Sequence, residues 1–150
     1  MEKKTIFARM AQVKAVLSET KIAKSGHNKF AGFKYHELSD FLNVINRLNN
    51  EYGVCDFVEI NKDACKITLV SIDDATDRYE VSVPYSDAEM LGKGGAASNV
   101  DAVQRLGSTV TYIRRYLYMT AYNIQENDGV DSAEPVKKVA KPKELDTDTF

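Results

Sequence analysis

Three successive segments of this chain have the residue pattern of β-strands, and no helical segment separates them. Val54 to Ile60, Cys65 to Ile72 and Arg78 to Tyr85 each alternate apolar with polar residues or are rich in β-branched residues. The run DDATD, Asp73 to Asp77, supplies a turn between the second and third segments. The sequence therefore predicts a three-stranded antiparallel meander.

Helical periodicity flanks this meander on both sides. Apolar residues recur at helical spacing from Thr5 to about Thr20 and from about His36 to Glu51, where Gly53 follows as the expected helix-ending glycine. A third, long helix is predicted from Val100 to about Tyr122. The predicted class is α+β, with the meander packed against the long C-terminal helix and flanking helices around it. The stripe expected to be buried on the long helix consists of Val103, Leu106, Val110, Ile113 and Leu117.

The stretch KIAKSGHNKFAGFKY, residues 21–35, loses the helical period. It contains Gly26 and Gly32 and alternates lysines with aromatic residues, which is typical of a loop or a short β-hairpin. We therefore expect a lysine/aromatic hairpin before the second helix.

The net charge of −2 hides a strong segregation of charge along the chain. Residues 1–35 carry +6, residues 36–92 carry −8, residues 93–120 carry +3 and residues 121–150 carry −3. Two basic segments separated by an acidic one predict a positive surface for a polyanion if the fold brings them together. The alternative is two separate solvated faces.

Several classes of function lack their signatures. No apolar run is long enough to cross a bilayer, which predicts a soluble intracellular protein. Cys55 and Cys65 have neither zinc spacing nor a disulfide framework, and GKGG (residues 92–95) lacks the P-loop spacing. No catalytic nucleophile motif is present, so we expect no enzyme and no cofactor. A metal-dependent nuclease stays open as an alternative because Glu126, Asp128 and Asp131 cluster after the long helix.

The long helix is unusual in its polar face. If the predicted stripe faces the core, the opposite face of the helix is polar and Arg114 lies on its flank. Arginine on a polar helix face can contact phosphate, and tyrosine can stack on bases. The alternative is a structural or assembly protein that uses the tyrosine-rich helix as a subunit interface. The far face predicted in this way holds Gln104, Ser108, Thr111, Arg115, Tyr118 and Tyr122.

At these residues the sequence resembles the ERF family of phage single-strand annealing proteins. One matching motif is K-S-G-x-N-x-F with a following K-Y, and a second is the Y-G at residues 52–53. A more distant similarity is to the ring-forming annealing domain of eukaryotic recombination mediators. The most specific match is Q-x-x-G-S-x-x-T-Y-x-x-R-Y, formed by Gln104, Gly107, Ser108, Thr111, Tyr112, Arg115 and Tyr116.

The resemblance implies non-enzymatic pairing of complementary DNA strands by a homo-oligomeric ring or helical filament in the bacterial cytoplasm. A groove would hold single-stranded DNA, and a phage or host single-stranded DNA-binding protein or exonuclease would be a further partner; no membrane is involved. The annealing domain would span residues 1–131 and a disordered tail residues 132–150. The end of the tail, ELDTDTF, resembles the acidic tip of bacterial single-stranded DNA-binding proteins, and the alternative is an acidic tail that only adds solubility. The expected DNA-binding residues are Arg114, Arg115, Lys24, Lys29, Lys34, Tyr35, Lys93 and Arg105.

Overall fold

The predicted meander is the central sheet of the protein. The computed structural model describes residues 3–29, 32–85 and 102–126. Within them the sheet has the strand order β3-β4-β5, with both neighbouring pairs antiparallel. The α+β class is confirmed. The elements in chain order are α1 (Ile6–Glu19), β1 (Gly26–Asn28), β2 (Phe33–Tyr35), α2 (Leu38–Tyr52), β3 (Val54–Ile60), β4 (Cys65–Ser71), β5 (Asp74–Val83) and α3 (Ala102–Tyr122).

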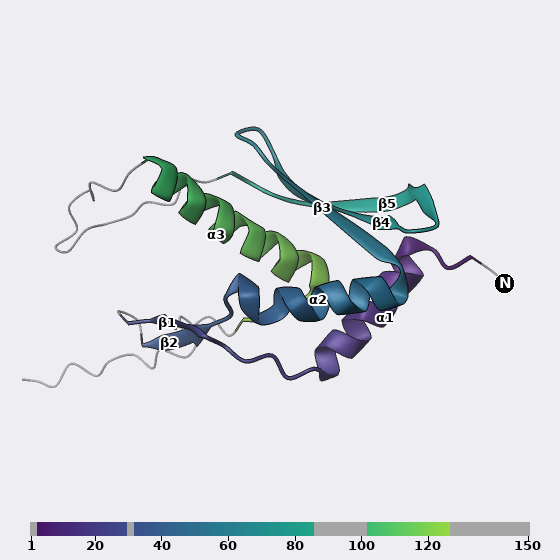
Figure 1. Ribbon diagram of the computed structural model, residues 1–150, viewed down its shortest axis with the longest axis horizontal. Helices are drawn as coiled ribbons and strands as arrows, with labels where there is room; N and C mark the ends of the chain where they lie inside the picture. The colour runs from purple at the N-terminus through teal and green to yellow at the C-terminus, as the bar shows by residue number, and fades with distance from the viewer. Residues whose placement is uncertain (1–2, 30–31, 86–101, 127–150) are drawn as a thin grey trace, which may run out of the picture.

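The elements are arranged around α3. Figure 1 shows α3 between the sheet on one side and α2 with the β1-β2 hairpin on the other. One continuous core joins α1, α2, α3 and the inner face of the sheet. None of the helices in the described ranges has an apolar stretch long enough to cross a bilayer.

Helix α1 matches its prediction. Its apolar residues that recur at helical spacing, Ile6, Met10, Val13 and Leu17, are all buried. The helix begins after Thr5, whose side chain accepts a hydrogen bond from the backbone N–H of Ala8 and thereby satisfies one of the unpaired donors of the first turn.

The acidic run before β5 differs from its prediction. Strand β5 begins at Asp74 rather than Arg78, and a bulge separates the pairs Val70↔Arg78 and Ser71↔Asp74. A turn remains at residues 72–73, and the acidic side chains also pair with the N-terminal segment: Asp73 with Arg9 of α1 and Asp74 with Lys3. Asp77 accepts a 2.6 Å hydrogen bond from the N–H of Ile6 at the helix start, where a carboxylate also complements the helix dipole.

Gly53 ends α2 in the left-handed conformation, with φ 70°, as predicted. A Cβ atom here would collide with the guanidinium of Arg9, which donates a 2.8 Å hydrogen bond to the carbonyl of Tyr52 and ion-pairs with Asp73. Glycine therefore both permits the turn and leaves room for the arginine that joins α1 to the end of α2.

The orientation predicted for α3 is wrong at both ends of the helix. Val103 and Leu106, expected in the core, are 74% and 59% exposed, and the N-terminal end of α3 extends past α2 (Figure 1). Tyr118 and Tyr122, expected on the polar face, are buried. The prediction holds for Ile113 and Leu117, which are buried, while Val110 is half-buried.

The two buried tyrosines are stable in the core because their hydroxyls have partners. The hydroxyl of Tyr118 donates to the carboxylate of Asp56 on β3 at 2.5 Å. The Tyr122 hydroxyl exchanges hydrogen bonds of 2.8 and 3.1 Å with the side-chain amide of Asn49 on α2. The C-terminal half of α3 thus packs on both sides, which a single amphipathic stripe does not describe.

Candidate nucleic-acid interface

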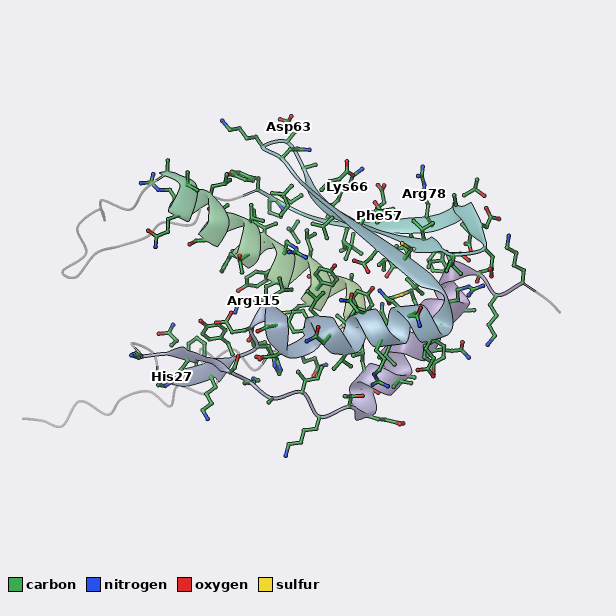
Figure 2. All side chains as sticks on the ribbon, in the orientation of Figure 1. His27, Phe57, Asp63, Lys66, Arg78 and Arg115 are labelled. Atoms are coloured by element: carbon green, nitrogen blue, oxygen red, sulfur yellow. The ribbon has the colours of Figure 1, made fainter. Side chains whose placement is uncertain are left out.

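Arg115 joins the hairpin to helix α3. Its guanidinium carbon lies 4.7 Å from the ring centroid of Tyr35 on β2, and 5.6 and 5.1 Å from those of Tyr112 and Tyr116 on its own helix. Its Nη1 donates a 3.2 Å hydrogen bond to the carbonyl of His36. Figure 2 shows Arg115 in the space between α3 and the hairpin, which carries His27. The side chain therefore combines cation–π contacts with a backbone hydrogen bond.

Gly26 places the ring of Tyr35. The two residues are paired in the hairpin register, and a Cβ atom on Gly26 would lie 2.6 Å from Cδ2 and Cζ of that ring. A side chain at this position would displace the ring, since such atoms normally stay at least 3.4 Å apart. The glycine of the K-S-G motif thus leaves room for the Tyr35 ring that contacts Arg115.

The base of the hairpin is held by a second set of hydrogen bonds. The carboxylate of Asp40 accepts from the backbone N–H groups of Ser25, at 2.9 Å, and Glu37, at 2.8 Å. Burial alone would raise the pKa of Asp40, but these hydrogen bonds from Ser25 and Glu37 hold it below its usual value. Asp40 therefore stays ionised and continues to fix the start of the hairpin.

Glu126, one of the three carboxylates of the nuclease alternative, accepts a 2.6 Å hydrogen bond from the backbone N–H of His36. The other two, Asp128 and Asp131, lie outside the described residues. Within the described ranges, no three His, Cys, Asp or Glu side chains gather closely enough to hold a metal ion. Glu126 thus has a structural partner at the hairpin.

Two hollows are both lined by Tyr35 and Arg115, and together we call them the hairpin groove. The larger, of about 580 Å³, runs between the hairpin base and α3. The smaller, of about 300 Å³, is lined by Asn28, Phe33, Tyr35, Arg115 and Tyr116. The larger is lined by Tyr35, Glu37, Gln104, Gly107, Ser108, Thr111, Tyr112 and Arg115.

The lining of the hairpin groove coincides with the most specific motif of the sequence. Six of the seven residues of Q-x-x-G-S-x-x-T-Y-x-x-R-Y line the larger hollow, and Tyr116, the seventh, lines the smaller. They form one face of α3 because they recur three or four residues apart. This face differs from the one that packs against the sheet.

The positions of the other expected cations vary. Lys29, Lys34 and Arg105 are exposed, and Lys24 is half-buried just before β1. Lys93 lies outside the described residues. The structure thus brings Tyr35 and Arg115 into contact and leaves three lysines on or beside the hairpin.

Arg114 lies on the other flank of α3 from Arg115. It lines a separate hollow of about 470 Å³ against β3, together with Asp56, Phe57 and Tyr118. Two arginines adjacent in the chain therefore face different grooves, as a 100° step around a helix allows.

Tyr112 and Tyr116 were not among the residues predicted from the sequence to bind DNA. Both were part of the motif, and their i, i+4 spacing with Arg115 between them was the available signal. The Glu37 hydrogen bond raises the pKa of Tyr35, with burial adding to it, and burial raises the pKa of Tyr116. These hydroxyls are neutral at physiological pH, so the groove presents neutral aromatic rings around one guanidinium.

A small antiparallel sheet, a long helix and a hairpin closed on it by arginine and tyrosine define an α+β protein with an aromatic groove around one arginine. The model of the ERF superfamily matches residues 6–148. The chain belongs to the ERF superfamily, as the motifs indicated. Searches of curated proteins and of solved structures each gave no match.

Proposed function

We propose that this protein binds single-stranded DNA in the hairpin groove and promotes pairing of complementary strands, as a phage-type single-strand annealing protein in the bacterial cytoplasm. Family membership is consistent with this role. The observation that carries the proposal is that all seven residues of the helix motif, Arg115 among them, line the hairpin groove beside the lysine-bearing hairpin.

The chemistry of the groove suits a flexible polyanion. Exposed Lys29 and Lys34 on the hairpin and Arg105 on α3 offer cations to phosphates without reading sequence. Lys24, Lys93 and Arg115 complete the proposed set of cations, whereas Arg114 faces the separate hollow against β3. A groove with cations and aromatic rings is the arrangement that single-strand binders use.

A homo-oligomer is part of the proposal. Val103 and Leu106 are large apolar side chains exposed on the N-terminal half of α3. Exposed apolar groups that lie together commonly mark a protein interface. A ring or helical filament would cover them and place many hairpin grooves along one DNA strand.

The test measures binding and annealing with labelled complementary oligonucleotides at several salt concentrations, with and without Mg²⁺. We expect Lys34→Ala to weaken binding of all sequences alike and to lower the slope of log affinity against log salt by about 0.7, the value for one phosphate contact on a single strand. The matched control is Arg78→Ala, since Arg78 is an exposed cation of β5 that Figure 2 places away from the hairpin.

Failure of the protein to bind or anneal single strands at low salt would refute the proposal. Equal losses from Lys34→Ala and Arg78→Ala would refute the location of the groove. Shortening of the labelled strand that requires Mg²⁺ would favour the nuclease instead.

A further inference from the structure

We infer that Tyr112 and Tyr116 are the stacking platform for nucleobases in the hairpin groove, and that Arg115 is the positioning residue that holds the two rings. The inference rests on the proposed function, because it assumes that single-stranded DNA is the occupant of the groove. It names the side chains that would contact the bases, whereas the proposed function concerns cations that would contact the phosphates.

Three of the tyrosines near the groove have no ring face open to a base. Tyr118 and Tyr122 are 4% and 1% exposed, and their hydroxyls are hydrogen-bonded inside the fold. Tyr35 borders the groove, but Gly26 lies against its ring on one side and Arg115 covers the ring at 4.7 Å. None of the three offers an open ring face to a base.

Tyr112 and Tyr116 remain, and they are the exposed tyrosines of α3. Their side chains are 47% and 37% exposed, and each lines one of the two hollows. Their ring centroids lie 4.7 Å apart at an interplanar angle of 54°. Two tilted rings so close together cannot stack fully on each other, so they retain aromatic surface for another planar group.

Arg115 fixes these rings from the hairpin side. The guanidinium lies within 5.6 Å of both ring centroids, while its Nη1 is hydrogen-bonded to the His36 carbonyl. A side chain held at its polar end restricts the rings that pack against it, which lowers the entropy lost when a base binds.

The chemistry of the lining selects a nucleobase over an apolar protein segment as the occupant. Gln104, Ser108 and Thr111 place amide and hydroxyl groups along the same face as Tyr112. A base that stacks through its π-face on tyrosine keeps its Watson–Crick edge available. Stacking at this site is therefore compatible with pairing to a second strand.

The experiment separates base binding from phosphate binding in the full chain. Affinities are measured for a thymidine oligonucleotide and for an abasic oligonucleotide of the same length and charge. The wild-type protein should prefer the thymidine strand by about tenfold or more, since one stacked base contributes on the order of 1–3 kcal/mol. Tyr112→Leu and Tyr116→Leu should each reduce that preference and leave the abasic affinity unchanged, whereas Tyr112→Phe and Tyr116→Phe should retain it.

Phe57→Leu is the matched control, because Phe57 is a 57% exposed aromatic residue of β3 that Figure 2 places on the sheet, away from the hairpin. It should leave the preference unchanged. Photocrosslinking of 5-iododeoxyuridine strands to the wild-type protein gives a second readout that needs no variant, and the crosslinks should fall on Tyr112 and Tyr116.

Equal wild-type affinity for the two strands would overturn the platform and leave the proposed function standing. The platform would also fall if the leucine variants weakened binding of both strands equally, or if the crosslinks fell on Tyr35. If neither strand bound, the proposed function itself would fail.

Discussion

Substitution of Gly26 by alanine tests how the hairpin groove is built. Gly26 lies on β1 opposite Tyr35, and its φ is not in the left-handed region, so alanine is compatible with the backbone. The new Cβ would lie 2.6 Å from two ring atoms of Tyr35 and would have to move the ring by at least about 0.8 Å to reach the 3.4 Å of ordinary contact. That movement disturbs the ring where it contacts Arg115.

The size of the effect follows from two opposing contributions. Alanine in place of glycine at a compatible position stabilises the folded protein by about 0.4–1 kcal/mol, because it lowers the conformational entropy of the unfolded chain. Loss of the Tyr35–Arg115 contact costs about 0.5–2 kcal/mol, and the displaced packing adds to this cost. We therefore expect Gly26→Ala to destabilise the protein by about 1 kcal/mol. In a Tyr35→Ala background, where no ring obstructs the Cβ, the same change should stabilise by about 0.5 kcal/mol.

The assay is urea unfolding of the four proteins of this double-mutant cycle. The interaction energy between the two positions should be about 1–2 kcal/mol, within the range for residues in direct contact. If Gly26→Ala changed the free energy of unfolding equally in both backgrounds, Tyr35 would not lie against Gly26. The requirement for glycine in the K-S-G motif would then need another explanation.

Two further predictions concern the buried tyrosines. Tyr122→Phe should lower the free energy of unfolding by about 1–3 kcal/mol, because the buried Oδ1 of Asn49 loses the hydroxyl that donates to it, while Nδ2 keeps its bond to Asp56, whereas Tyr112→Phe at an exposed position should change it by less than about 0.5 kcal/mol. Equal effects in urea unfolding would contradict the buried pair. Burial raises the pKa values of Tyr118 and Tyr122 above the ordinary value of 10.0, so these groups bind their protons more tightly in the folded state. The contribution of these two groups to the free energy of unfolding is complete below pH 10 and is lost as the pH rises above 10. The urea concentration at the unfolding midpoint should therefore decrease as the pH is raised from 9 to 11, and should decrease less steeply in Tyr118→Phe. A midpoint independent of pH would contradict this prediction.

The candidate site was predictable in part. The motifs named Tyr35 and Arg115 as groove residues, and the structure brings them into contact. The sequence placed Arg114 on a flank and Arg115 on the far face of the helix but predicted DNA binding for both, because the groove that each faces depends on where the sheet and the hairpin pack around α3. The roles of Gly26 and His36 in fixing Arg115 were also invisible, since both act through residues distant in the chain.

The sequence by itself determined the features that depend on local periodicity and backbone conformation. The four-residue stripe of α1, the left-handed Gly53 and the antiparallel meander all follow from residues within one element or from adjacent elements. Only the tertiary structure decided which tyrosines of α3 are core and which are surface. Tyr122 is buried because Asn49, 73 positions away, satisfies its hydroxyl, while Tyr112 is exposed because its part of the helix borders a groove. Polar residue types can occupy either environment, and burial becomes favourable only when the fold supplies a hydrogen-bond partner.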